Sequence, residues 1–146
     1  MKNILILYYS GVGSTRIVAE QFKEKLDKQL KVSLFSVENI PPNLNFNIYD
    51  GFIFGYPVFH THPPIRLLKF IDTMNPLDSE KPAFIFNTRG LYSANSQRIL
   101  AKHLTKKNIK IIMDEEYRSP ASGVSLLAPF IKQAWCFEKH ISNLFA

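Results

Sequence analysis

The chain of 146 residues contains a single cysteine, Cys136, and no long apolar run. One thiol cannot form a disulfide framework, a cysteine-ligated zinc site or an iron–sulfur cluster within the chain. Because no apolar run is long enough for a bilayer and no signal peptide precedes the first apolar run, we predict no membrane span and a cytoplasmic location. The length is that of one domain, so residues 1–146 are expected to form a single unit.

Dense basic runs with interleaved aromatic residues are also missing, although the formal net charge is +6. The lysines are scattered along the chain, as is typical of a solvated surface. Nucleic acid is therefore not expected as a partner. An acidic partner remains compatible with the excess of positive charge.

Apolar runs and amphipathic stretches alternate along the whole chain. Strands are predicted at 3–8, 31–37, 49–55, 83–86 and 109–113, the last with an extension over 114–117. Helices are predicted at 15–29, 65–73, 95–107 and 129–143, and Ile17, Val18, Phe22 and Leu26 share one face of the first. This alternation predicts an α/β fold, a three-layer sandwich in which helices cover both faces of a five-stranded parallel sheet.

Ligands of such sheets bind beyond the carboxyl ends of the strands, where the strand order reverses. Three predicted loops, 9–14, 56–63 and 88–95, begin at these ends. They are also the stretches with the most unusual composition in the chain. We therefore predict one binding site, built from these three loops.

The first loop joins a strand to a helix N-terminus through small and hydroxyl residues, a natural place for a phosphate group. Its residues are Ser10, Gly11, Val12, Gly13, Ser14 and Thr15. The lysine of a nucleotide-triphosphate loop is absent, and Arg16 breaks the dinucleotide pattern G-x-G-x-x-G. A phosphate monoester is the anion that remains. An ordinary helix cap by Ser10 or Ser14 explains the same residues equally well.

The other two loops carry groups suited to a flat ring. The second includes Pro57, Val58, Phe59, His60 and Thr61, and the third includes Thr88, Arg89, Gly90, Tyr92 and Asn95. Gly90 permits a tight turn, Tyr92 is able to stack on a ring, and Asn95 suits a helix N-cap. A histidine in such a loop is equally typical of a side chain exposed to water, and His60 with His62 is a weak metal pattern.

Together the three loops resemble those of the flavodoxin family, over nearly the full length of the chain. The segment from Ser10 to Thr15 resembles the family's phosphate loop, Gly-Tyr-Pro-Val-Phe at 55–59 its second loop, and 87–90 with Tyr92 and Asn95 its third. More narrowly, the chain resembles the flavodoxin domain of flavodoxin–ferredoxin fusion proteins of anaerobes. The resemblance implies the strand order 2-1-3-4-5 with FMN at the switch point.

The resemblance also implies how FMN would be held. Its phosphate would lie on residues 10–15, and its ring between the second and third loops, with Phe59 and Tyr92 as neighbours. Thr88 would contact the ribityl chain, and backbone groups near Gly90 the pyrimidine edge. FMN carries the redox chemistry, so no catalytic side chain is assigned. The implied function is electron transfer between redox partner proteins, here with acidic docking surfaces because this chain is basic.

Two other functions stay open. One is a small FMN-dependent reductase or oxidase acting on a quinone, a nitro compound, haem or a porphyrin precursor. The other is a flavodoxin-like interaction module that has lost its flavin, and its best support is Val12, which stands where the family has threonine. The chain has no extra substrate domain. This favours a redox carrier over a substrate-specific oxidoreductase.

Overall fold

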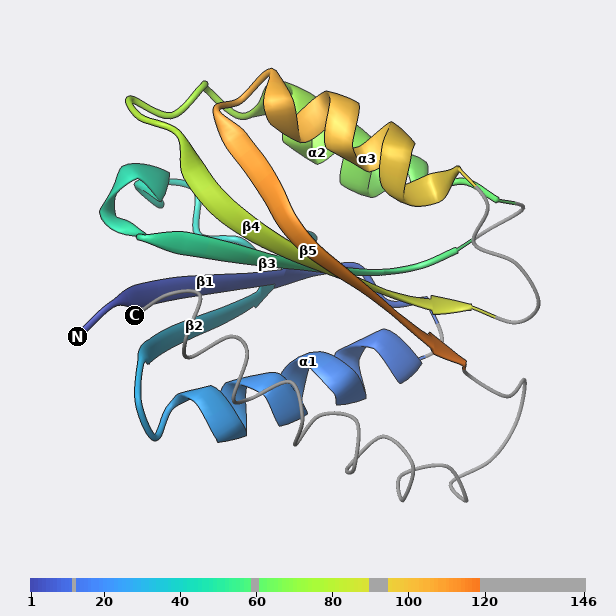
Figure 1. The fold of residues 1–146 in the computed structure, drawn as a ribbon, viewed down its shortest axis with the longest axis horizontal. Coiled ribbons are helices and arrows are strands. Elements are labelled where there is room, and N and C mark those ends of the chain that lie inside the picture. The colour runs from blue at the N-terminus through green and yellow to red at the C-terminus, as the bar shows by residue number, and fades with distance from the viewer. Residues whose placement is uncertain (12, 59–60, 90–94, 119–146) are drawn as a thin grey trace.

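Five parallel strands form one sheet in the order β2-β1-β3-β4-β5 (Figure 1). The computed structural model describes residues 1–11, 13–58, 61–89 and 95–118. Its elements are β1 (Asn3–Tyr8), α1 (Ser14–Leu26), β2 (Lys31–Ser36), the 3₁₀ turn η1 (Phe46–Ile48), β3 (Gly51–Pro57), α2 (Ile65–Thr73), β4 (Lys81–Arg89), α3 (Ser96–Thr105) and β5 (Ile109–Arg118). The predicted α/β class and strand order are confirmed.

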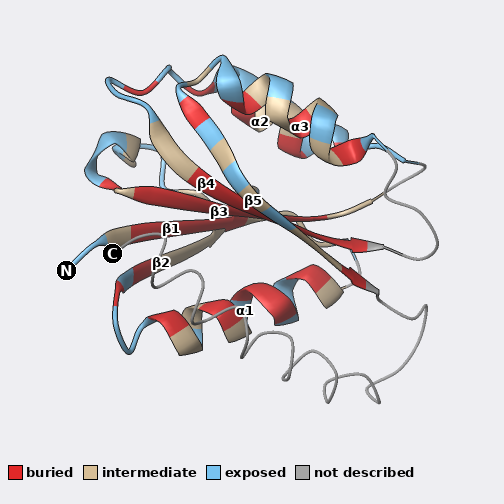
Figure 2. Cartoon of the chain, viewed as in Figure 1, coloured by how far each residue is buried: buried red, intermediate tan, exposed pale blue. Residues whose placement is uncertain are grey.

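The sheet is covered on both faces, with α1 on one side and α2 and α3 on the other (Figure 1). Its central strands are accordingly apolar throughout rather than alternating: Ile4, Leu5, Ile6 and Leu7 of β1 have no exposed surface. Figure 2 shows this burial along β1 and β3. The continuous apolar runs in the sequence are therefore the signature of a doubly covered parallel sheet.

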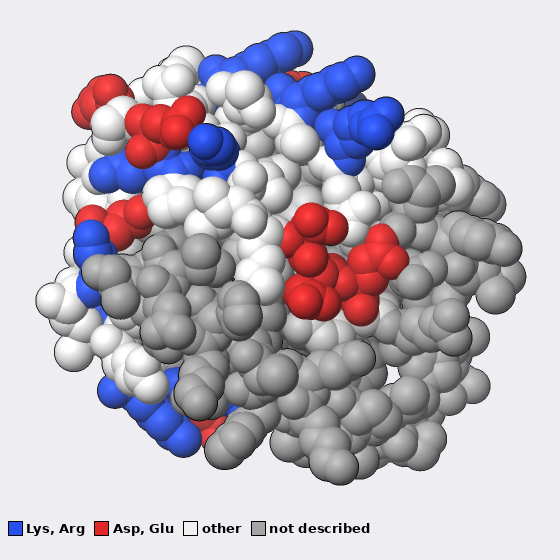
Figure 3. Space-filling model, viewed as in Figure 1, with Lys and Arg blue, Asp and Glu red and all other residues white. Residues whose placement is uncertain are grey.

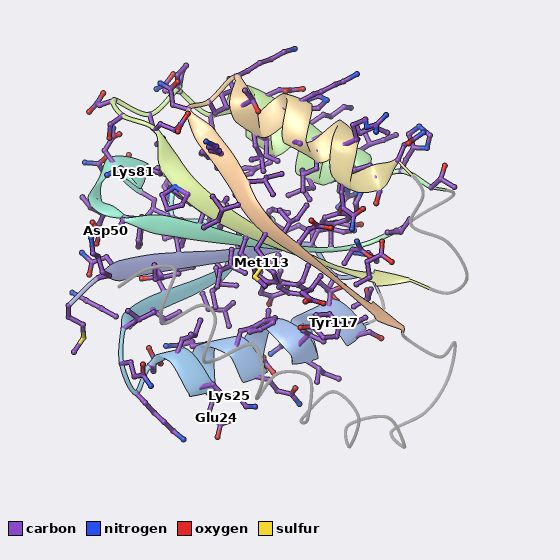
Figure 4. The ribbon with its side chains drawn as sticks, viewed as in Figure 1. Glu24, Lys25, Asp50, Lys81, Met113 and Tyr117 are labelled. Atoms are coloured by element: carbon purple, nitrogen blue, oxygen red, sulfur yellow. The ribbon has the colours of Figure 1, made fainter. Side chains whose placement is uncertain are left out.

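Aromatic rings fill the space between α1 and the sheet. The ring of Phe22 on α1 lies 5.1 Å from that of Phe86 and 6.3 Å from that of Tyr117, measured between centroids. Figure 4 shows Tyr117 reaching from β5 toward α1. Burial raises the pKa of Tyr117, mainly because the charged phenolate would lose its hydration. The ring contacts on this face therefore pack β5, an edge strand, against α1.

Some element boundaries differ from those predicted. The first helix ends at Leu26 rather than at residue 29, because Asp27 accepts the Val32 N–H at 3.2 Å and directs the chain into β2. β4 begins at Lys81 and ends at Arg89, longer than predicted, because its polar ends pair with β5. Ile17, predicted on the buried face of the first helix, is 47% exposed. The predicted last helix, 129–143, lies outside the described residues.

Within the described ranges, no helix combines the length and apolarity that a bilayer crossing requires.

Candidate functional site

The carboxyl ends of β1, β3 and β4 meet at one edge of the sheet, as predicted for the three loops. Beyond β1, the Tyr9 N–H donates to the Gly55 carbonyl at 3.0 Å. Beyond β3, the Val58 N–H donates to the Thr88 carbonyl at 2.9 Å. These two bonds continue the sheet pairing past the strands. They fix the starting points of the first two loops against the neighbouring strand.

The first loop turns sharply into α1 at Gly13. The φ angle of Gly13 is +98°, a left-handed conformation that glycine adopts without steric cost. Ser10 Oγ accepts the Gly13 N–H at 3.0 Å, and the Gly13 carbonyl accepts the Ile17 N–H at 3.1 Å. Among the described residues, apart from its chain neighbours, no atom lies within 4 Å of a Cβ placed on Gly13. The described part of the chain therefore leaves room at this position.

The N-terminus of α1 is suited to an anion. Gly13 is the N-cap residue and makes no side-chain capping bond, and the first turn contains no acidic residue. The positive end of this 13-residue helix thus has no carboxylate to compensate it in that turn. Ser10 satisfies the N–H of the cap residue itself rather than those of the helix. Ser10 therefore does not cap the first turn of α1 in the way that the sequence left open, and the N–H groups of that turn suit an anion.

A cation also stands in this first turn. Arg16 Nε donates to Glu20 Oε1 at 2.8 Å, and the hydrogen bond to Glu20 raises the pKa of the arginine. Both side chains are exposed. The pair therefore adds little stability, but it keeps a permanent positive charge near the open N-terminus.

Two hydroxyl groups join α1 to β4 beneath this loop. Thr15 Oγ1 and Thr88 Oγ1 lie 3.0 Å apart, and the two residues are 73 positions apart in the chain. Thr15 is 1% exposed and Thr88 is 4% exposed. The structure therefore brings together two residues that the sequence assigned to separate parts of the site.

The second loop is described in part. Pro57 ends β3, and Val58 is held by its bond to Thr88. Thr61 has a φ of +68° and its exposed hydroxyl lies 3.3 Å from His62 Nδ1. The predicted ring neighbours Phe59 and His60 lie outside the described residues, as does Val12 of the first loop.

The third loop begins after Arg89, the last residue of β4. Asn95 is exposed and precedes α3 at the N-cap position, as predicted, but its side chain makes no capping bond. Gly90 and Tyr92 lie outside the described residues. The contacts predicted for these loops with a flavin ring stay predictions.

A buried polar group on the opposite face of the sheet was not predicted. Tyr56 Oη lies 3.4 Å from Ser96 Oγ, and burial raises the pKa of Tyr56 to about 12, opposed in part by that hydroxyl. The Asn87 amide also lies near Tyr56 and lowers its pKa, but neither amide atom has hydrogen-bond geometry with any group of the described chain. In the sequence, this buried polar group could have been predicted only from the position of Asn87 in a buried apolar strand.

Charged side chains are distributed unevenly over the surface. β5 carries the acidic run Asp114, Glu115 and Glu116, and acidic atoms gather over this strand in Figure 3. Gln97 Nε2 donates to Glu116 Oε1 at 3.1 Å. In the described ranges, no three His, Cys, Asp or Glu side chains are arranged to hold a metal ion.

Comparison with known proteins agrees with this geometry. A flavodoxin from the domain Archaea superposes with a TM-score of 0.74 at 14% identity, over 98% of each chain. The flavodoxin of Fusobacterium nucleatum bound to flavin mononucleotide superposes with a TM-score of 0.72 at 16% identity, over all of both chains. Rubredoxin oxygen:oxidoreductase from Desulfovibrio gigas matches with a TM-score of 0.71 at 18% identity, over 99% of this chain and 36% of that one.

Sequence comparison gives a family. No curated protein sequence matches the chain significantly. The family model described as flavodoxin domain matches residues 5–133, which include all three loops. The chain therefore belongs to the flavodoxin family.

Proposed function

We propose that this protein binds FMN and transfers electrons between redox partner proteins. The observation that carries the proposal is the N-terminus of α1, which has no acidic residue in its first turn and where a Cβ on Gly13 would meet no described atom within 4 Å beyond its chain neighbours. Such an N-terminus favours one phosphate group, and the family supplies the reason for that phosphate to belong to a flavin. The Fusobacterium flavodoxin, which is bound to flavin mononucleotide, supports the same assignment.

The residues of the first loop fit a phosphate monoester. Hydroxyl groups of Ser10, Ser14 and Thr15, and backbone N–H groups of the loop, are donors, as a doubly charged anion requires. Val12 contributes no hydroxyl but keeps its backbone N–H. The absence of acidic residues from the first turn of α1 removes the nearest source of repulsion.

The ring of the cofactor would lie against the second and third loops. The residues that we assign to it are Pro57, Val58, Phe59, His60, Thr61, Arg89, Gly90, Tyr92 and Asn95. FMN supplies the redox chemistry when bound. The protein's part is to hold the ring at the edge of the sheet, where a partner reaches it, and to exclude water from its buried side.

The partner is proposed to present an acidic docking surface, because the chain carries a net charge of +6. The acidic run on β5 lies beside the carboxyl end of β4, since Glu116 pairs with Asn87, so such a partner would contact the edge on the side away from β5. We place the protein in the cytoplasm, as the sequence predicts.

A titration with FMN tests the proposal. The purified protein should quench the fluorescence of added FMN at one equivalent and show a visible flavin spectrum. Saturation by FMN without steady oxidation of NADH or NADPH supports electron transfer. Sustained turnover with a quinone would instead assign it to the reductases, and a protein that never quenches FMN fluorescence would be an interaction module.

A further inference from the structure

The hydroxyl groups of Thr15 and Thr88 form a direct hydrogen bond with each other, in addition to lying at the same predicted site. Their oxygen atoms are 3.0 Å apart, and both residues are buried. Thr15 belongs to the first turn of α1 and Thr88 to the end of β4. The bond thus links the helix whose N-terminus faces the anion to the strand that leads into the third loop.

This pair of hydroxyl groups has one proton that the hydrogen bond between them does not use. Two hydroxyl groups carry two protons, and the bond between them uses one. No other side-chain hydrogen bond of Thr15 or Thr88 occurs in the described part of the chain. A buried hydroxyl proton without an acceptor is unfavourable, because water can no longer satisfy it. No described residue accepts this proton, and an acceptor brought by a ligand would satisfy it.

The position of the pair at the start of α1 points to a phosphate oxygen as that acceptor. Thr15 is the second residue of α1, at the positive end of the helix, whereas the Thr88 carbonyl is already occupied by the Val58 N–H. A phosphate oxygen in front of α1 would accept the proton of Thr15 in a charge-assisted bond. Thr88 would then donate to Thr15. Each bond would strengthen the other, because the oxygen of Thr15 becomes a better acceptor when its proton is drawn toward an anion.

We propose that Thr88 is a positioning residue for phosphate, which acts through Thr15. Thr88 donates its proton to Thr15 and thereby holds Thr15 as a donor to the phosphate monoester of the flavin. This role rests on the proposed function, and it differs from the contact with the ribityl chain that the sequence resemblance implies. It makes affinity for the phosphate depend on a strand residue that does not touch it.

Three variants test this role: Thr88→Val, which keeps the shape and removes the hydroxyl, Thr88→Ser, which keeps the hydroxyl, and Thr15→Val. The measurement is the affinity for FMN and for riboflavin, which lacks the phosphate, by fluorescence quenching. Removing the hydroxyl in Thr88→Val should lower the ratio of FMN to riboflavin affinity about tenfold, the size expected for one hydrogen bond in a charged network. Thr88→Ser should restore most of the ratio.

A double variant separates positioning from an independent contact. If Thr88 acts through Thr15, Thr15→Val combined with Thr88→Val should lower the ratio no further than Thr15→Val alone. Urea unfolding of each variant confirms that it is folded. Should Thr88→Val not fold, Thr88→Ala replaces it with the same expected loss.

The outcomes distinguish this role from the proposed function. If wild-type protein binds FMN and Thr88→Val lowers the affinities for FMN and riboflavin equally, or lowers neither, Thr88 does not position a phosphate donor. Additive losses in the double variant would also overturn the role. If wild-type protein binds neither FMN nor inorganic phosphate, both the proposed function and this role are wrong.

Discussion

Asn87 and Thr88 are consecutive residues near the end of β4, and their side chains lie on opposite faces of the sheet and differ in their hydrogen bonding. Thr88 points toward α1, and its Oγ1 lies 3.0 Å from Thr15 Oγ1. Asn87 lies on the face of α2 and α3 beside Tyr56, fully buried, and its amide has no hydrogen-bond partner in the described ranges. One buried polar side chain thus joins two elements, whereas its neighbour makes no hydrogen bond with the described residues.

The two faces also differ in the contacts that their side chains make near this edge. On the α1 face, the Phe86 ring lies directly over Gly55, where a Cβ would come within 2.1 Å of its Cζ atom. On the other face, Tyr56 and Ser96 approach only to 3.4 Å. On the α1 face a ring therefore fills the space over Gly55, whereas on the opposite face a buried phenol makes only a long hydrogen bond to Ser96.

The largest effect is expected at Gly55. Gly55→Ala should lower the free energy of unfolding by about 3 kcal/mol, because the buried Phe86 ring is held by Phe22 and Tyr117 and cannot move aside without strain. Urea denaturation measures the loss. The double variant Gly55→Ala with Phe86→Leu should lose less than the sum of the two single changes. Strict additivity would show that the contact is not tight.

A second effect belongs to the opposite face and depends on pH. Because burial raises the pKa of Tyr56 from 10 to about 12, the unfolded chain loses this proton before the folded chain does. Its contribution to stability is complete below pH 10 and is lost as the pH rises through 12, on the order of 2 kcal/mol. Urea midpoints at pH 9 and pH 11 should differ less in Tyr56→Phe than in wild type. An unchanged difference would contradict the assignment to Tyr56.

The smallest effects compare the two neighbours directly. Asn87→Leu should leave the free energy of unfolding within about 1 kcal/mol of wild type or raise it, because an apolar side chain replaces an amide that has no partner among the described residues. Thr88→Val should lower it by about 1 kcal/mol, because Thr15 then loses its partner. Urea denaturation of both variants would overturn the contrast if Asn87→Leu were the more destabilising.

Much of this contrast could not be predicted from the sequence. The apolar runs of β1 and β3 predicted the sheet, since burial on both faces leaves a continuous signature. The ends of β4 were missed, because Lys81 and Arg89 are in the strand through pairing with β5 and not through local pattern. The bond between Thr15 and Thr88 was missed because it joins residues 73 positions apart.

The edge of the sheet at which the three loops begin was predicted correctly, because strand ends meet there in any parallel sheet. The bounds were wrong, since residues 56–57 belong to β3 and residues 88–89 to β4. The exposure of Ile17 was not foreseen, since helical periodicity shows which residues share a face but not how wide the covered face is.

The most direct test of an anion at the start of α1 is a matched pair of variants at Gly13. Gly13→Asn and Gly13→Asp have the same shape and the same tolerance of positive φ, and no described atom beyond the chain neighbours lies within 4 Å of the Cβ of either. They differ in one negative charge. The affinity for FMN, measured by fluorescence quenching, should fall at least about 100-fold further in Gly13→Asp than in Gly13→Asn, because two anions would share one helix N-terminus. Equal affinities in the two variants would contradict the phosphate site.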